Sequence, residues 1–121
     1  MHALIIDDSR ALRRILRGML TDLGFSVAEA ANGQEGVAQL REGPMPDVVL
    51  VDWNMPVMTG LEFVREVRAD HRFRNLPLMM VTTETEMGQV TVALAAGVTE
   101  YVMKPFDKDV IADKLQLIGV A

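Results

Sequence analysis

The sequence contains no cysteine, so a disulfide framework and a thiolate metal site are both excluded. Histidine is scarce. Only His2, at the N-terminus, and His71, beyond the third expected helix, are present, and neither belongs to a recognisable catalytic triad. Positive charge is in deficit, with a net charge of -5. This balance argues against a protein that binds the phosphate backbone of a nucleic acid.

Long hydrophobic runs are missing as well. The run at the N-terminus spans only Ala3 to Ile6 before two acids follow, whereas the apolar region of a signal peptide needs roughly 7–15 residues. The other apolar runs are too short to cross a membrane. We therefore expect a cytoplasmic protein with no membrane partner, and the absence of cysteine is consistent with that location.

What is present is enough for one globular domain. The chain has 121 residues and half of them are hydrophobic, which allows a single buried core. No linker, low-complexity stretch or internal repeat divides it. We expect one domain over residues 1–121 and no output domain, unless the chain is a piece of a longer protein.

Short strand-like segments alternate with amphipathic ones. Five segments rich in Val, Ile, Leu and Met are strand-like: Ala3–Asp7, Ser26–Ala30, Asp47–Asp52, Leu78–Thr82 and Glu100–Met103. Most of them are nearly continuous apolar runs, typical of strands buried on both faces. Helical spacing predicts helices over residues 12–23, 33–41, 61–69, about 86–96 and from about 107. This order predicts an α/β fold of five βα units, a doubly wound sandwich around a five-stranded parallel sheet.

Two of the expected helices begin with the spacing of a capping box. Asn32 lies three residues before Glu35, and Thr59 lies three residues before Glu62. Leu12, Ile15 and the apolar residues that follow at helical spacing predict the buried face of the first helix.

Acids lie at the ends of two of the strands. Asp7 ends the first strand-like segment and Asp8 follows it, and Asp52 ends the third. In an open parallel sheet, ligands bind outside the carboxyl ends of the strands. Two carboxylates about 5 Å apart repel by about 3 kcal/mol at an effective dielectric near 20, so the site must take up a proton or a cation. Hard oxygen ligands in small number suit Mg²⁺.

Groups suited to phosphate chemistry lie at the ends of the third, fourth and fifth strands. Asp52 can act as a carboxylate nucleophile towards phosphorus. Lys104 supplies a cation and Thr82 a hydroxyl for phosphate oxygens, as phosphoryl transfer needs. Each residue alone has an ordinary interpretation, because a lone strand-end Asp usually caps a helix. Their coincidence at one edge of the sheet disfavours that interpretation.

The segments LIIDDSR, VLVDWNMPVMTG, MMVTTE and YVMKPF resemble the signature blocks of response-regulator receiver domains. The resemblance covers essentially the whole chain, and the spacing from Asp52 to Lys104 is most similar to that of the single-domain chemotaxis regulators. It implies a flavodoxin-like fold with strand order 2-1-3-4-5. It also implies an Mg²⁺ cofactor, for which Mn²⁺ can substitute.

The resemblance assigns a role to each site residue. Asp52 would be the phospho-acceptor and Lys104 would grip the phosphoryl group, with a cis bond between Lys104 and Pro105. Asp8, Asp52 and the backbone carbonyl of Asn54 would ligate the metal, while Asp7 would act through water.

It also implies a switch. Thr82 would turn inward to the phosphoryl group and Tyr101 would follow. Asn54 and Glu84 would tune dephosphorylation, and their residue types predict a short-lived phosphorylated state.

The expected partners are proteins. A histidine kinase or phosphotransfer protein would donate the phosphoryl group to a monomeric chain. The target would bind the fourth helix, fifth strand and fifth helix, and a flagellar motor switch protein is one such target. Residues 87–92 include a glycine and three β-branched residues, which are poor helix formers. The fourth helix is therefore either marginal and able to shift or simply held by packing.

The first helix carries a basic stripe: Arg10, Arg13, Arg14 and Arg17. The stripe either meets an acidic phosphodonor or is an ordinary solvated face. Three functions remain open: a signalling switch, a phosphate sink or shuttle in a relay, and, less favoured, an aspartyl-nucleophile phosphohydrolase. We expect no enzyme beyond catalysis of the chain's own phosphorylation and dephosphorylation.

Overall fold

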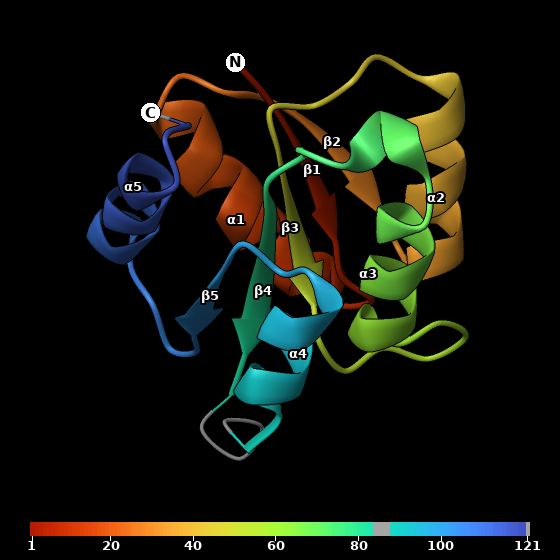
Figure 1. Cartoon of the computed structure of the whole chain (residues 1–121). Helices are drawn as coiled ribbons and strands as arrows, with labels where there is room; N and C mark the ends of the chain where they lie inside the picture. Colours follow the sequence, from red (N-terminus) through yellow and green to blue (C-terminus); the bar gives the residue numbers. More distant parts are fainter. Residues whose placement is uncertain (84–87, 121) are drawn as a thin grey trace.

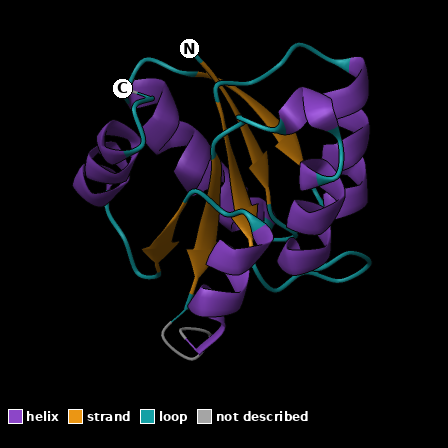
Figure 2. Cartoon of the chain, in the orientation of Figure 1, coloured by secondary structure: helices purple, strands orange, loops and turns teal. Residues whose placement is uncertain are grey.

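The computed structural model describes residues 1–83 and 88–120, where strands and helices alternate along the chain (Figures 1 and 2). The strands are β1 (His2–Ile6), β2 (Ser26–Ala30), β3 (Val48–Asp52), β4 (Leu78–Thr82) and β5 (Glu100–Met103). The helices are α1 (Arg10–Asp22), α2 (Gly33–Glu42), α3 (Gly60–Arg68), α4 (Val90–Ala96) and α5 (Lys108–Leu117), with a 3-10 turn η1 (His71–Phe73) before β4. The predicted α/β fold of five βα units is confirmed.

The five strands form one parallel sheet in the order β2-β1-β3-β4-β5, which is the flavodoxin-like order expected from the family. Strand order reverses between β1 and β3, and all carboxyl ends lie at the same edge (Figure 1). That edge is where an open α/β sheet binds its ligand.

Both faces of the sheet are covered by helices. α1 and α5 pack on one face, around a cluster that includes Leu16, Leu20 and Ile111 (Figure 1). α2, α3 and α4 cover the other face, where Phe63 is fully buried and Ala93 belongs to the same cluster. Because strands β1, β3 and β4 contribute alternate residues to the two clusters, they are buried on both sides, and their sequences are almost continuously apolar.

The helix starts follow their sequence signals. Thr59 and Glu62 form a complete capping box at α3. At α2 the Asn32 side chain accepts the Glu35 N–H at 2.9 Å, and its amide donates to the Glu35 carboxylate at 3.1 Å. The α2 arrangement therefore provides the predicted cap, with the return contact made between side chains.

The buried face of α1 differs from the sequence prediction, and the predicted start of α4 lies outside the described residues. Ile15 is 52% exposed, so the buried face of α1 is narrower than the apolar spacing suggested. The expected start of the fourth helix near residue 86 lies outside the described residues, and α4 begins at Val90 and ends before Gly97, whose φ of 116° is left-handed. Within residues 1–83 and 88–120, no helix combines the length and apolarity that crossing a membrane requires.

Candidate functional site

Asp52 is the last residue of β3 and only 5% of its surface is exposed. The segment behind it is tightly packed, because the Gly60 N–H donates to the Trp53 carbonyl at 3.1 Å. A Cβ atom on Gly60 would lie 2.8 Å from the Asp52 carbonyl oxygen, closer than real contacts allow. The start of α3 is thus fitted against the end of β3, which fixes the backbone beneath the Asp52 carboxylate.

Asp7 and Asp8 complete an acidic cluster with Asp52. Asp7 is 2% exposed and Asp8 is exposed, and one carboxylate oxygen from each of the three residues lies within 4.8 Å of the others. Backbone contacts position Asp7: its Oδ1 accepts the Ser9 N–H at 2.7 Å, and its carbonyl accepts a guanidinium N–H of Arg13. The three acids singled out in the sequence are therefore brought together.

The cluster makes ionisation of its members unfavourable. Burial, followed by the negative charge of Asp7, raises the pKa of Asp52 to about 6, although Lys104 and a backbone hydrogen bond from Asn54 oppose the rise. Burial is also the main cause that raises the pKa of Asp7, against the Ser9 N–H and Lys104. A site that resists ionisation in this way favours binding of a cation.

The donor set fits a hard divalent cation. Asp7 Oδ2 is buried and makes no hydrogen bond to any of the described residues, although such an atom normally has a partner. The cluster consists of carboxylate oxygens, which are the ligands preferred by Mg²⁺. The chain thus offers a candidate metal site at the carboxyl edge of the sheet.

Lys104 joins this cluster from the end of β5. Its Nζ lies 3.4 Å from Asp52 Oδ1, and its backbone N–H donates to the Thr82 carbonyl at 2.7 Å. The Lys104–Pro105 bond is cis, the conformation expected from the sequence. The ends of β1, β3 and β5 therefore supply three carboxylates and one ammonium to a single site.

Thr82 and Tyr101 lie on one face of the sheet, beside the cluster. Thr82 ends β4, is fully buried, and donates its hydroxyl to the Thr83 carbonyl at 3.3 Å. Tyr101 pairs with Met80, so its side chain shares a face with Thr82, two residues further along β4. Glu84, expected to tune dephosphorylation, lies outside the described residues.

One contact at the site was missed by sequence reasoning. The indole N–H of Trp53, a residue that is 5% exposed, donates to Gln89 Oε1 at 3.1 Å. Both residues line a hollow of about 360 Å³ beside Asn54. A buried indole N–H needs an acceptor, but the sequence alone does not show that the residue before α4 supplies it.

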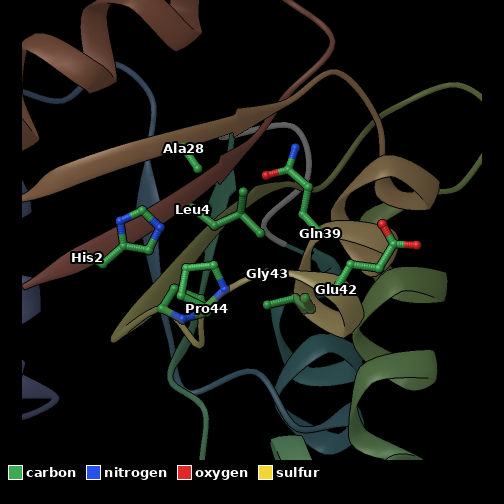
Figure 3. Close-up of a pocket in the computed structure, with 9 residues that line it drawn as sticks. His2, Leu4, Ala28, Gln39, Glu42, Gly43 and Pro44 are labelled. Carbon is green, nitrogen blue, oxygen red and sulfur yellow. The ribbon is translucent and has the colours of Figure 1, made fainter.

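A second hollow lies away from this chemistry. It has a volume of about 250 Å³ and is lined by residues of β1, β2, α2 and the segment after α2. Figure 3 shows His2, Leu4 and Ala28 of the strands opposite Gln39 and Glu42 of α2. None of the acids of the cluster lines it.

Comparison with known proteins agrees with this geometry. Residues 3–116 match the response regulator receiver domain. The chain is 43% identical over 119 residues to chemotaxis protein CheY1 of Helicobacter pylori strain J99, covering 98% of this chain and 96% of that protein. The structure of the chemotaxis response regulator CheY4 of Vibrio cholerae superposes with a TM-score of 0.90 at 37% identity, covering 97% of each chain.

The receiver domain of sensor histidine kinase PA1611 of Pseudomonas aeruginosa, determined with a magnesium ion coordinated in the active site cleft, superposes with a TM-score of 0.88. It is 29% identical and the match covers 98% of this chain and 97% of that one. Fold, acidic cluster and sequence similarity lead to one conclusion: the chain belongs to the response regulator receiver domain family.

Proposed function

We propose that this chain is a response regulator of a two-component phosphorelay, in which Asp52 accepts a phosphoryl group from a phosphohistidine. The donor is a histidine kinase or a phosphotransfer protein. The observation that carries this proposal is the buried Asp52 carboxylate within 4.8 Å of two further acids, with Lys104 Nζ at 3.4 Å. This combination of nucleophile, cation ligands and ammonium is what phosphoryl transfer requires.

In the reaction, an Asp52 carboxylate oxygen forms a bond to phosphorus as the bond from phosphorus to the donor imidazole nitrogen breaks. The nucleophile must be ionised, and with a pKa of about 6 it is mostly so at neutral pH. Lys104, whose Nζ lies 3.4 Å from the carboxylate, would contact a phosphoryl oxygen after transfer.

Asp8, Asp52 and the Asn54 carbonyl would hold Mg²⁺, with Asp7 acting through water, and Mn²⁺ can substitute. The bound cation supplies neutralisation of the charge on the phosphoryl oxygens. Support comes from the orphaned Asp7 Oδ2 and from the magnesium ion named for the related PA1611 receiver domain.

Phosphorylation would then alter a protein-binding surface in a cytoplasmic, monomeric chain whose receiver domain spans residues 1–121. Thr82 moves to the phosphoryl group, Tyr101 follows, and the surface of α4, β5 and α5 changes its population of partner-binding forms. That surface carries exposed apolar side chains: Val92, Met103 and Val110. Since CheY1 of Helicobacter pylori and CheY4 of Vibrio cholerae are chemotaxis proteins, a flagellar motor switch protein is the proposed target.

Asn54 and Glu84, which follow Asp52 and Thr82 by two residues in the sequence, give this phosphorylated state a short lifetime in our proposal. The lifetime is measured as loss of phosphate from the phosphorylated chain in Mg²⁺ buffer. Persistence for many hours would contradict the assignment.

The test of the switch is capture of partners on immobilised chain with and without Mg²⁺ and beryllofluoride, a phosphate mimic. A partner retained only with the mimic supports the switch, and D52N serves as the control that cannot bind the mimic. A chain that accepts phosphate but gains no partner is instead a phosphate sink. Release of many phosphates per chain from small phosphate esters would identify a phosphohydrolase.

A further inference from the structure

Tyr101 is the only tyrosine of the chain, and two charged side chains contact it. The Nζ atom of Lys114, on α5, lies 4.7 Å from the centroid of the Tyr101 ring. The same Nζ lies 3.4 Å from Glu100 Oε1, which also accepts the Tyr101 backbone N–H at 2.9 Å. One carboxylate oxygen therefore ties the backbone of Tyr101 to the cation that lies over its ring.

We infer that Glu100 and Lys114 form a clamp that holds the Tyr101 ring at the edge of the sheet and opposes its movement toward Thr82. The two residues are positioning residues, because they act on the switch through Tyr101 and touch neither phosphate nor metal. The inference rests on the proposed function, which requires the ring to have two positions.

The topology explains why the clamp depends on where the ring lies. Tyr101 shares a sheet face with Thr82, whereas α5 covers the opposite face, where Ile111 and Leu115 pack. Lys114 therefore reaches around β5, which is the edge strand of the sheet that the described residues form. Movement of the ring toward Thr82 carries it away from this edge, so the cation–π contact is lost when the switch turns.

Glu100 keeps Lys114 in place. The side chains of Lys114 and Glu100 are 27% and 17% exposed, so the ion pair is partly shielded from water. Because β5 is an edge strand, some of its N–H groups face away from the sheet. The Glu100 carboxylate accepts a hydrogen bond from one of them, the Tyr101 N–H. The carboxylate is thereby fixed close to Lys114 before the cation meets the ring.

The expected effect is moderate. A cation–π contact at a partly exposed site corresponds to about a two- to fivefold preference for the conformation that contains it. A phosphate mimic that selects the inward ring must overcome this preference. By linkage, removal of the clamp strengthens mimic binding by up to the same factor, which is reached when the outward ring dominates in the free chain.

The test uses ¹⁹F NMR of the chain labelled with 3-fluorotyrosine. Because the chain contains a single tyrosine, every signal comes from Tyr101 and each conformer gives its own. Spectra are recorded while beryllofluoride is titrated in the presence of Mg²⁺. K114M removes the cation but keeps an apolar stem, K114R restores a cation, and E100Q removes the ion pair. K108M is the matched control, since Lys108 lies on the same helix and pairs instead with Asp22 at 3.6 Å.

In K114M we expect the mimic-free signal to move toward its mimic-bound position and half-saturation to need about two- to fivefold less beryllofluoride. E100Q should change both in the same direction, while K114R and K108M should match the original chain. The clamp is wrong if K114M behaves like K108M, or if K114R behaves like K114M. If the original chain binds the mimic by Trp53 fluorescence while its Tyr101 signal stays unchanged, the proposed switch itself is wrong, and the clamp with it.

Discussion

The Asp52 carboxylate is held in a place that disfavours its own charge. Burial and Asp7 raise its pKa to about 6, and only Lys104 and the Asn54 N–H oppose them. Because the folded pKa lies above the ordinary value, the native chain binds a proton more readily than the unfolded chain does. The contribution of Asp52 to stability therefore falls as pH rises from about 4 to about 6 in the absence of metal. A bound cation would offset the cost of the ionised carboxylates, so the same burial that destabilises the metal-free site favours cation binding.

Replacement of Asp52 with Asn should remove this cost. In metal-free buffer at pH 7.5 we expect D52N to be more stable than the original chain by about 2–3 kcal/mol, with the difference shrinking toward pH 4. The measurement is urea unfolding at several pH values in a chelator. D113N, which changes an exposed carboxylate of α5, should show no such gain. Identical pH profiles for D52N and the original chain would contradict the account.

At the scale of elements, the joint between β3 and α3 determines where the acceptor points. Gly60 lies against the Asp52 carbonyl and Trp53 Cα, both 2.8 Å from where its Cβ would be. The loop between them contains Val57 at a φ of 71°, with Met58 N–H donating to the Pro56 carbonyl at 2.8 Å. Val57 is 75% exposed, so most of its surface lacks the packing that could offset its left-handed backbone.

Two glycines at helical positions should respond oppositely to alanine. G60A forces the β3–α3 joint apart, and we expect it to lower stability by about 1–3 kcal/mol. G18A adds a methyl group to α1 where nothing lies within 4 Å, and it should raise stability by about 0.5–1 kcal/mol. Urea unfolding followed by circular dichroism measures both. Equal effects of the two substitutions would show that the joint is not tightly fitted.

At the scale of the whole molecule, the sequence predicted the parts that depend on local pattern. The strands β1, β3 and β4 are recognisable because burial on both faces makes them continuously apolar, and the parallel topology then brings Asp7, Asp8, Asp52 and Lys104 together. Pairings between distant side chains were not predictable, such as Trp53 with Gln89 or Lys114 with Glu100. Such pairs depend on how close two separate helices or strands lie in the fold, and no periodic pattern in the sequence indicates that distance.

The basic stripe of α1 shows the same limit. Arg13 and Arg17 both pair with Glu29, at 3.1 and 2.6 Å, so these two arginines are tied to β2. Arg10 and Arg14 form no ion pair within residues 1–83 and 88–120. Arg13 and Arg17 therefore have a structural role, whereas Arg10 and Arg14 are available for electrostatic steering of a partner.

Charge reversal at Arg10 and Arg14 should slow phosphotransfer without loss of fold. For R10E/R14E we expect about a 10-fold lower transfer rate at low ionic strength, fading as salt is added. The rate is measured from a phosphorylated donor protein by stopped flow, using Trp53 fluorescence. R65E, a single reversal on the exposed face of α3, is the control and is compared with the single reversals R10E and R14E. A salt-independent effect, or an equal effect of R65E, would assign Arg10 and Arg14 to an ordinary solvated face.

The central claim is that Asp52 accepts one phosphoryl group in a cation-dependent reaction. The most direct measurement is intact-protein mass spectrometry during incubation with a phosphohistidine donor and Mg²⁺, with the modified residue located by borohydride reduction of the acyl phosphate. We predict one phosphoryl group per chain on Asp52, lost when a chelator replaces Mg²⁺ and absent from D52N. Transfer at an unchanged rate in D52N, or a label on a residue other than Asp52 in the original chain, would contradict the account.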